Sequence, residues 1–215
     1  MAINYDMIEI DDQPMSSRFF GEGKWLTEFV TPSSLEVCEL HDGLTSSLVS
    51  IEDRVVACWQ WVASEVKYKR FVSGTLRIEN KTERQNDLWC DPSMTICTKV
   101  GNCANKAFLL ASLIRRDMDA DSVHCVLGNL YNGKAGGHAW VQVRMNDQDY
   151  IVEATKDSGP VMVLAELAHR YESVHLFNDQ QVWAIKGRTV MEPYTACFST
   201  WLTTYLDQVY IEGGK

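Results

Sequence analysis

Residues 99–116 read KVGNCANKAFLLASLIRR, a polar loop that passes directly into an apolar segment with Cys103 at the junction. Asn102 is a good helix N-cap, so the sequence predicts that Cys103 lies in the first turn of a helix. Free N–H groups and the helix dipole favour negative charge there, which suits a nucleophilic thiolate. Gly101 allows a tight turn and close approach of a substrate. The alternative is a structural cysteine, because free cysteines are often buried.

Helices are predicted on both sides of this loop. The segment after Cys103 is apolar on more than one side, which is typical of a buried helix at the centre of a domain. A helix is also predicted to begin at Ser50, whose hydroxyl can cap it ahead of an apolar stripe at helical spacing. Residues 161–171 predict a further helix, whereas residues 67–98 are polar and irregular and predict a long, partly ordered connection.

From Ser122 onward apolar residues no longer recur at helical spacing but at every second position, which indicates strands. Segments rich in β-forming residues, separated by Asn132-Gly133 and Asn146-Asp147, predict an antiparallel meander, with two later strands; these segments are 123–131, 138–145, 150–155, 173–177 and 181–187. The predicted class is α+β, with helices carrying the cysteine packed on an antiparallel sheet.

The 215 residues predict a single domain with three parts. Residues 1–48 show no strong period and are expected to wrap around the core. Residues 50–160 hold the candidate catalytic core. Residues 161–215 form a C-terminal extension of helix and strand.

The composition of the chain argues against several classes of function. A net charge of −9 without a basic run argues against nucleic-acid binding. No apolar stretch reaches the roughly 18 residues of a membrane span and the N-terminus is acidic, so a soluble protein without a membrane partner is expected. The seven cysteines are odd in number and several lie in apolar segments, which favours reduced thiols and a cytoplasmic location. Their spacing fits no zinc finger, and no cofactor is expected.

His138 is the candidate partner of Cys103, because it begins a strand after two glycines, in GGHAWVQV. The other histidines, at positions 41, 124, 169 and 175, lack that setting and are expected to be surface or core residues. Strand parity places His138, Trp140 and Gln142 on one face. A two-residue turn at Asn146-Asp147 sets His138 opposite Thr155 with Glu153 on the diagonal, and a slip of two residues sets His138 opposite Glu153.

These segments resemble the transglutaminase-like superfamily of papain-fold cysteine enzymes. The resemblance runs from about Trp59 to Asp157 and is carried by GNCANKAFLLASLIR, GGHAWVQV and YIVEATKD, in that order. It implies that Cys103 is the nucleophile, that His138 is the general base and acid, and that Glu153 takes the place of the family's Asp. Two departures are the longer Glu153 and the replacement, by Asn102 and Asn105, of residues that are acidic in many relatives.

The resemblance also suggests residues around the triad. Trp89 matches a segment that can line the substrate groove or support an oxyanion, with a core aromatic as the alternative. Asn102 borders the nucleophile, and the backbone N–H of Cys103 is a further oxyanion donor. Trp140 is expected to shield the Cys–His pair, although aromatic residues in strands are more often core. Gln60 is a weaker candidate amide donor.

The implied activity is attack of Cys103 on an amide of a protein or peptide, with a thioester intermediate. Hydrolysis is favoured over cross-linking to an amine, because no second domain for an acceptor protein is evident in the chain. The alternatives are a protein-glutamine acyltransferase, a peptide-binding scaffold without chemistry, and, less favoured, a metal hydrolase that uses the same three side chains as ligands. The oligomeric state is not indicated.

Overall fold

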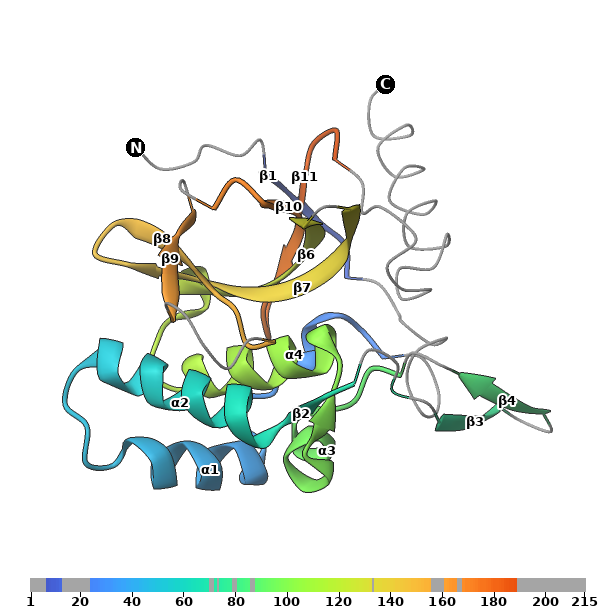
Figure 1. The fold of residues 1–215 in the computed structure, drawn as a ribbon, viewed down its shortest axis with the longest axis horizontal. Helices are drawn as coiled ribbons and strands as arrows, with labels where there is room; N and C mark the ends of the chain where they lie inside the picture. Colours follow the sequence, from blue (N-terminus) through green and yellow to red (C-terminus); the bar gives the residue numbers. More distant parts are fainter. Residues whose placement is uncertain are drawn as a thin grey trace.

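The computed structural model has helices on one face of a curved antiparallel sheet (Figure 1), which confirms the α+β class. The described residues are 7–12, 24–69, 72, 74–78, 81–85, 88–132, 134–155, 161–165 and 168–188. About half of the predicted C-terminal extension, residues 189–215, lies outside them.

The helical layer contains both helices predicted in the first half of the chain. Their bounds are α1 (Leu35–Thr45), α2 (Ile51–Glu65), α3 (Pro92–Thr98) and α4 (Cys103–Ile114), with short 3-10 turns η2 (Thr27–Phe29) and η3 (Ala120–Ser122). Ser50 caps α2 by accepting a hydrogen bond from the Asp53 N–H, as predicted. Helix α1 was not predicted, because two of its three buried residues, His41 and Thr45, are polar and hide the apolar period.

The main sheet has the order β1-β11-β10-β6-β7-β8-β9 and is antiparallel throughout. Its strands are β1 (Met7–Ile10), β6 (Val123–Asn132), β7 (Lys134–Met145), β8 (Gln148–Val152), β9 (Met162–Leu164), β10 (Tyr171–Phe177) and β11 (Val182–Ile185). The predicted meander is confirmed as β6, β7 and β8, and both later strands are confirmed.

The helix predicted over residues 161–171 is wrong. Met162–Leu164 instead forms the edge strand β9, in which Met162 pairs with Val152 and Leu164 with Tyr150. Pairing with the open edge of β8 satisfies the backbone of this apolar run, so tertiary context overrides its helical pattern.

The long, partly ordered connection predicted over residues 67–98 contains several short elements. Strand β2 (Lys67–Tyr68) pairs in parallel with β5 (Val100–Gly101), directly before Cys103. Strands β3 (Gly74–Ile78) and β4 (Lys81–Gln85) form a hairpin beside the helical layer (Figure 1), and α3 follows. The β2–β5 pair therefore ties the loop before Cys103 to the end of α2.

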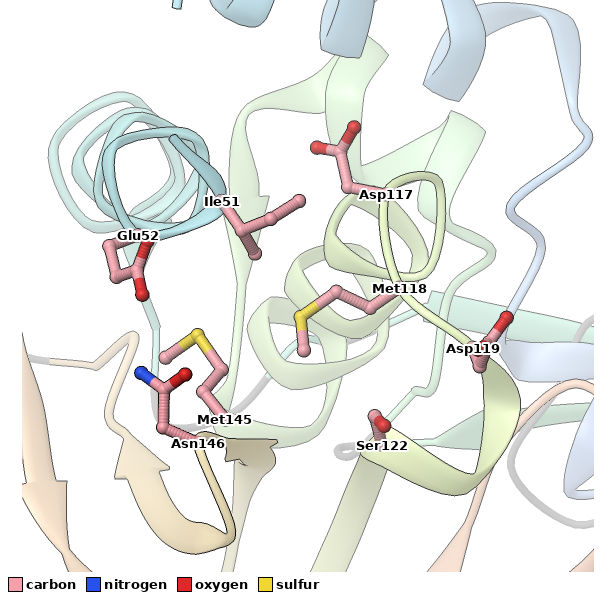
Figure 2. A pocket seen from close by; sticks show the side chains of 8 residues that line it. All are labelled: Ile51, Glu52, Asp117, Met118, Asp119, Ser122, Met145 and Asn146. Carbon is pink, nitrogen blue, oxygen red and sulfur yellow. The ribbon is translucent and has the colours of Figure 1, made fainter. Parts of the chain in front are cut away.

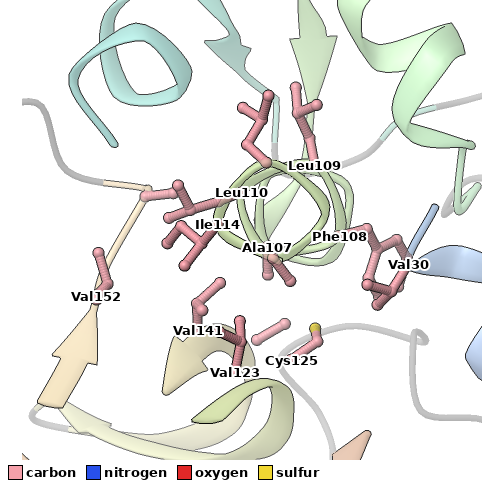
Figure 3. Packing of buried hydrophobic residues seen from close by; sticks show 14 of the residues in the cluster. Val30, Ala107, Phe108, Leu109, Leu110, Ile114, Val123, Cys125, Val141 and Val152 are labelled. Carbon is pink, nitrogen blue, oxygen red and sulfur yellow. The ribbon is translucent and has the colours of Figure 1, made fainter. Parts of the chain in front are cut away.

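Helix α4 lies at the centre of the core, and all of its residues are buried. Figure 3 shows Ala107 and Ile114 on the side of α4 that faces Val123 and Val141 of the sheet, with Phe108 directed toward Val30. This enclosure confirms the buried central helix predicted from its apolar pattern. It also gives the N-terminus of α4 a fixed position relative to β7 and β8.

Candidate active site

Cys103 is the first residue of α4, as predicted. The side chain of Asn102 caps the helix by accepting a hydrogen bond from the Asn105 N–H at 3.0 Å. Gly101 allows the loop to pack closely on α4, because a Cβ there would lie 3.0 Å from the Cβ of Asn105. The φ angle of Gly101 is not in the left-handed region. The sulfur therefore projects from the helix end at which the free N–H groups favour negative charge.

The β7–β8 turn brings His138 and Glu153 together. Asn146 and Asp147 have φ angles of 51° and 60°, which makes the two-residue hairpin turn that the sequence left as one of two registers. In this register Val141 pairs with Val152, and β8 ends there. Glu153 then lies on the diagonal from His138, and its Oε2 is 2.6 Å from Nε2 of the imidazole.

The Glu153 carboxylate is enclosed by donors. Oε1 accepts hydrogen bonds from the Thr155 N–H at 2.8 Å and hydroxyl at 2.7 Å, and Oε2 accepts one from the Tyr171 hydroxyl at 3.0 Å. Burial would raise the pKa of Glu153, but the charge of His138 and hydrogen bonds from His138 and Thr155 lower it to about 2. The carboxylate is therefore ionised at neutral pH.

The His138 ring connects this carboxylate to Cys103. Burial would lower the pKa of His138, but the charge of Glu153, hydrogen bonds with Cys103 and Glu153, and the charge of Cys103 raise it to about 10. Because Nε2 binds Glu153, Nδ1 is the ring nitrogen left for the sulfur. The three side chains thus form a continuous Cys–His–carboxylate chain.

Trp140 covers the imidazole. Its ring stacks on that of His138 at a centroid distance of 6.2 Å and an interplanar angle of 27°, and packs edge-on against Tyr171 at 5.1 Å. Gly128 makes room for it, since a Cβ there would lie 2.5 Å from the Trp140 ring and 2.2 Å from the Glu172 carbonyl oxygen. Trp140, which was expected to shield the Cys–His pair, therefore lies beside the imidazole of that pair.

Trp89 lies on the core side of its segment. Its ring is fully buried and packs edge-on against Phe29 at 5.5 Å and Phe108 at 5.1 Å, which corresponds to the core alternative that the sequence left open. The Asn105 amide holds this segment beside α4: it accepts from the Cys90 N–H at 2.9 Å and donates to the Leu88 carbonyl at 3.1 Å. Asn105 thus aligns the segment with α4.

Two residues that the sequence analysis did not select connect α2 to the site. The indole N–H of Trp59 donates to the Glu153 carbonyl at 2.8 Å. Lys106 is buried and donates from Nζ to the carbonyls of Ala63 and Val66, at the C-terminal end of α2. Trp59 was read only as part of an apolar stripe, and a lysine one turn into a helix gives no pattern signal. Gln60, the weak candidate, is exposed on α2.

The triad is nearly enclosed. Cys103, His138 and Glu153 have exposed fractions of 5%, 9% and 8%. A pocket of about 330 Å³ lies elsewhere, beyond the C-terminal end of α4, and is lined by Asp117, Met118 and Met145 among others (Figure 2). Because α4 has 12 residues, that pocket is about 18 Å from Cys103 along the helix. It is separate from the triad.

The remaining histidines are surface or core residues, as the sequence predicted. His169 is exposed, and His41 is buried in an ion-pair cluster with Asp117. Burial lowers the pKa values of His124 and His175 to about 4, so both are neutral at physiological pH. Within the described residues, no three His, Cys, Asp or Glu side chains are grouped in a way that could hold a metal ion. None of the described helices is long and apolar enough to cross a membrane.

The sequence profile of the transglutaminase-like superfamily matches residues 39–153, more than half of the chain, and ends on Glu153. The chain belongs to the transglutaminase-like superfamily. The resemblance found in the three short segments is thereby confirmed over a longer range, which includes part of α1 and all of α2. No curated protein matches the sequence.

Solved structures with a similar fold share little sequence. LapG from Legionella pneumophila is 16% identical, with a TM-score of 0.46 over 71% of this chain and 90% of that chain. Its calcium-bound form is 16% identical, with a TM-score of 0.40 over 80% and 99%. A candidate cysteine protease from Cytophaga hutchinsonii is 16% identical, with a TM-score of 0.43 over 78% and 56%. At this identity the likeness concerns the fold alone.

Proposed function

We propose that the protein is a cysteine enzyme that hydrolyses amide bonds of a protein or peptide through a thioester on Cys103. The observation that carries the proposal is the hydrogen-bonded chain from Cys103 through His138 to Glu153, in which the imidazole is held between a sulfur and an ionised carboxylate. Membership of a superfamily that includes cysteine enzymes supports the same assignment. Glu153 takes the role of the family's aspartate, and its four hydrogen-bond donors offset the greater freedom of the longer side chain.

The reaction follows from these positions. The sulfur of Cys103 attacks the amide carbonyl carbon, and the backbone N–H of Cys103, free at the start of α4, stabilises the oxyanion. The C–N bond then breaks as the imidazolium of His138 gives its proton to the leaving amine. In the second half His138 takes a proton from water, which attacks the thioester and releases the acid. Glu153 orients the ring and stabilises its charged form in both halves.

A cross-linking acyltransferase is the second candidate. It uses the same thioester, but a primary amine resolves it in place of water. The low exposure of Cys103 and His138 favours this candidate, because exclusion of water protects a thioester from hydrolysis. A peptide-binding scaffold that retains the triad without turnover is the non-catalytic alternative.

Mass spectrometry of products separates these candidates. The full chain is incubated with a peptide library, with and without a primary amine, beside a Cys103→Ser variant. Pairs of peptide fragments whose masses add up to the parent peptide plus one water indicate a protease. Conversion of a glutamine amide to an acid indicates a deamidase, and amine incorporation with loss of ammonia indicates an acyltransferase. Products in equal amount from wild type and Cys103→Ser, or none from wild type, would contradict an enzymatic role for Cys103.

We also propose that the protein works in a reducing compartment such as the cytoplasm. All six described cysteines are free thiols, and three of them, Cys58, Cys90 and Cys125, have pKa values raised by burial. Trapping of thiols in intact cells with a membrane-permeant alkylating reagent tests this. Full labelling of the exposed Cys97 supports a reducing location, and a population blocked by oxidation contradicts it.

A further inference from the structure

A second pocket, of about 180 Å³, lies on the sheet face away from α4, and its lining residues come from strands β1, β6, β7, β8, β10 and β11 and the turn η3. Its polar lining residues are Asp121, His124, Gln142, Arg144 and Asp149. It is separate from the triad, since Gln142 is four residues beyond His138 on β7, about 13 Å along the strand, with Trp140 between them. A ligand here would not contact Cys103.

Gln142 supplies an unsatisfied acceptor in this pocket. Its side chain is only 6% exposed, and its Oε1 has no hydrogen-bond partner among the described residues. A buried carbonyl oxygen without a donor is destabilising, so such atoms in native proteins usually have a partner, whether protein, water or ligand. The partner that fits Gln142 here is a group that donates hydrogen bonds.

The ring groups of the pocket are uncharged. His124, the cross-strand neighbour of Gln142, packs edge-on against Trp183 at a centroid distance of 5.0 Å. Burial and the charge of Arg144 lower the pKa of His124 to about 4, so it carries no positive charge at neutral pH. The indole of Trp183 is only half-buried and offers an aromatic surface.

The charges of the pocket leave an excess of negative charge. Arg144 is already engaged, because its Nε and Nη2 donate to the two carboxylate oxygens of Asp149 at 2.9 and 3.0 Å. Asp121 adds a second carboxylate. With His124 neutral, two carboxylates and one guanidinium face the pocket, and the whole chain carries a net charge of −9. A cation is therefore favoured over an anion.

We propose that this pocket binds a planar guanidinium group, as in an arginine side chain. A guanidinium has donors and no acceptor, which matches the unpartnered Oε1 of Gln142, and its flat face packs well on the indole of Trp183. Its charge is complementary to Asp121. The apolar lining residues Met7 and Leu176 suit the methylene stem that an arginine carries.

Calorimetric titration of the full-length protein with N-acetylarginine methylamide tests the proposal. The corresponding citrulline derivative keeps the planar shape but is neutral, and the lysine derivative keeps the charge but is not planar. The arginine derivative is expected to bind at least about tenfold more tightly than either, because charge and planar donors act together. Equal binding of citrulline, binding of the carboxylate ligand acetylglutamate in its place, or no binding at all would overturn the proposal.

Variants of the pocket residues test whether the arginine derivative binds in this pocket. Gln142→Leu removes the acceptor and is expected to weaken arginine binding about tenfold, whereas Gln60→Leu, the same change on the exposed face of α2, is expected to leave it unchanged. Arg144→Gln is expected to strengthen binding, because it removes a like charge and releases Asp149. This gain does not depend on how well Gln142→Leu folds. Unchanged affinity in both Arg144→Gln and a folded Gln142→Leu would place any binding outside this pocket.

A comparison of two ligands shows whether the guanidinium comes from a small molecule or from a polypeptide. Agmatine is a free guanidino compound with an ammonium at its other end, and an arginine-containing peptide presents the same group from a polypeptide. Tighter binding of the peptide assigns the site to a protein ligand, and tighter binding of agmatine assigns it to a small metabolite. Failure of both contradicts guanidinium recognition, and neither outcome depends on the activity of Cys103.

Discussion

A buried histidine–carboxylate pair lies near each end of α4, and the two pairs have nearly the same geometry. At the N-terminal end, Nε2 of His138 is 2.6 Å from Glu153; beyond the C-terminal end, Nε2 of His41 is 2.7 Å from Asp117. The difference is in the next neighbours. The ring of His138 bonds to Cys103, whereas Nδ1 of His41 faces a second carboxylate, Asp42, at 3.1 Å.

The carboxylates also differ in what else they bind. Asp117 shares its charge with Arg54, whose Nη1 is 2.6 Å from Oδ1. Apart from His138, Glu153 accepts hydrogen bonds only from neutral groups of Thr155 and Tyr171 among its described contacts, so its charge acts on the imidazole. A histidine–carboxylate pair is therefore not by itself a catalytic feature. Two features distinguish the candidate active site from a structural ion pair: the group on the other ring nitrogen, and the lack of a competing cation among the described contacts of the carboxylate.

The largest expected effect is loss of the nucleophile. Cys103→Ser should reduce amide hydrolysis about 10⁴-fold or more, because the reaction then lacks its covalent step. The melting temperature should change little, since the two side chains are similar in size. Initial rates on a substrate found by the peptide screen, together with thermal melts, check both expectations. Residual activity near the wild-type rate would show that another residue does the chemistry.

The two histidines can be exchanged for alanine as a matched pair. His138→Ala should lower activity about 10²- to 10⁴-fold through loss of the general base and acid. His41→Ala should leave the rate per folded molecule unchanged but lower the free energy of unfolding by about 3 kcal/mol, since it leaves Asp117 buried with one partner fewer. Rates and urea unfolding curves of both variants measure this. Loss of activity in a folded His41→Ala protein would break the distinction between the two pairs.

The pH dependence of stability tests the charged state of the His138–Glu153 pair. The raised pKa of His138 contributes stability that is complete below its ordinary value of 6.5 and is lost as the pH rises through about 10. The lowered pKa of Glu153 contributes stability that is complete above 4.5 and is lost as the pH falls through about 2. Wild type should therefore exceed Glu153→Gln in melting temperature most between about pH 4.5 and 6.5. Thermal melts from pH 3 to 10 test this, and a constant difference across that range would contradict it.

The smallest expected effect concerns the link from α2 to the site. Trp59→Phe keeps an aromatic ring but removes the hydrogen bond to the Glu153 carbonyl, and should cost about 1 kcal/mol of stability. Because the chain after β8 then has one anchor fewer, activity should fall as well. Trp61→Phe is the control, because Trp61 lies on the same helix and its ring packs against Lys99. Equal effects of the two substitutions would remove the case for Trp59 as a positioning residue.

Local patterns were enough to predict the central parts of this arrangement. The Asn102 cap and the apolar run predicted Cys103 at the start of a buried helix. The Asn146-Asp147 turn predicted two registers, and the structure has the one that puts Glu153 diagonal to His138. These features depend on residues close in sequence. The resemblance to the superfamily added the order of the three segments.

Contacts between distant segments were not predictable in the same way. Tyr171, which donates to Glu153, lies in a run that reads as helix until the β6–β10 pairing is known. The side chains of Lys106 and Trp59 donate hydrogen bonds to backbone carbonyls of distant segments. His41 in α1 pairs with Asp117, 76 residues away. Such long-range pairs leave no periodic signal, and they decide which histidine is structural.

The most direct test of the central claim is a competition between two cysteines for iodoacetamide at pH 6, read by peptide mass spectrometry. Cys97 is exposed on α3, whereas Cys103 is almost fully buried. If the imidazolium of His138 holds Cys103 as a thiolate, Cys103 should be labelled faster than Cys97 despite its lower exposure, and this order should reverse in His138→Ala. Faster labelling of Cys97 in the wild-type protein, or an order that His138→Ala does not change, would contradict the account.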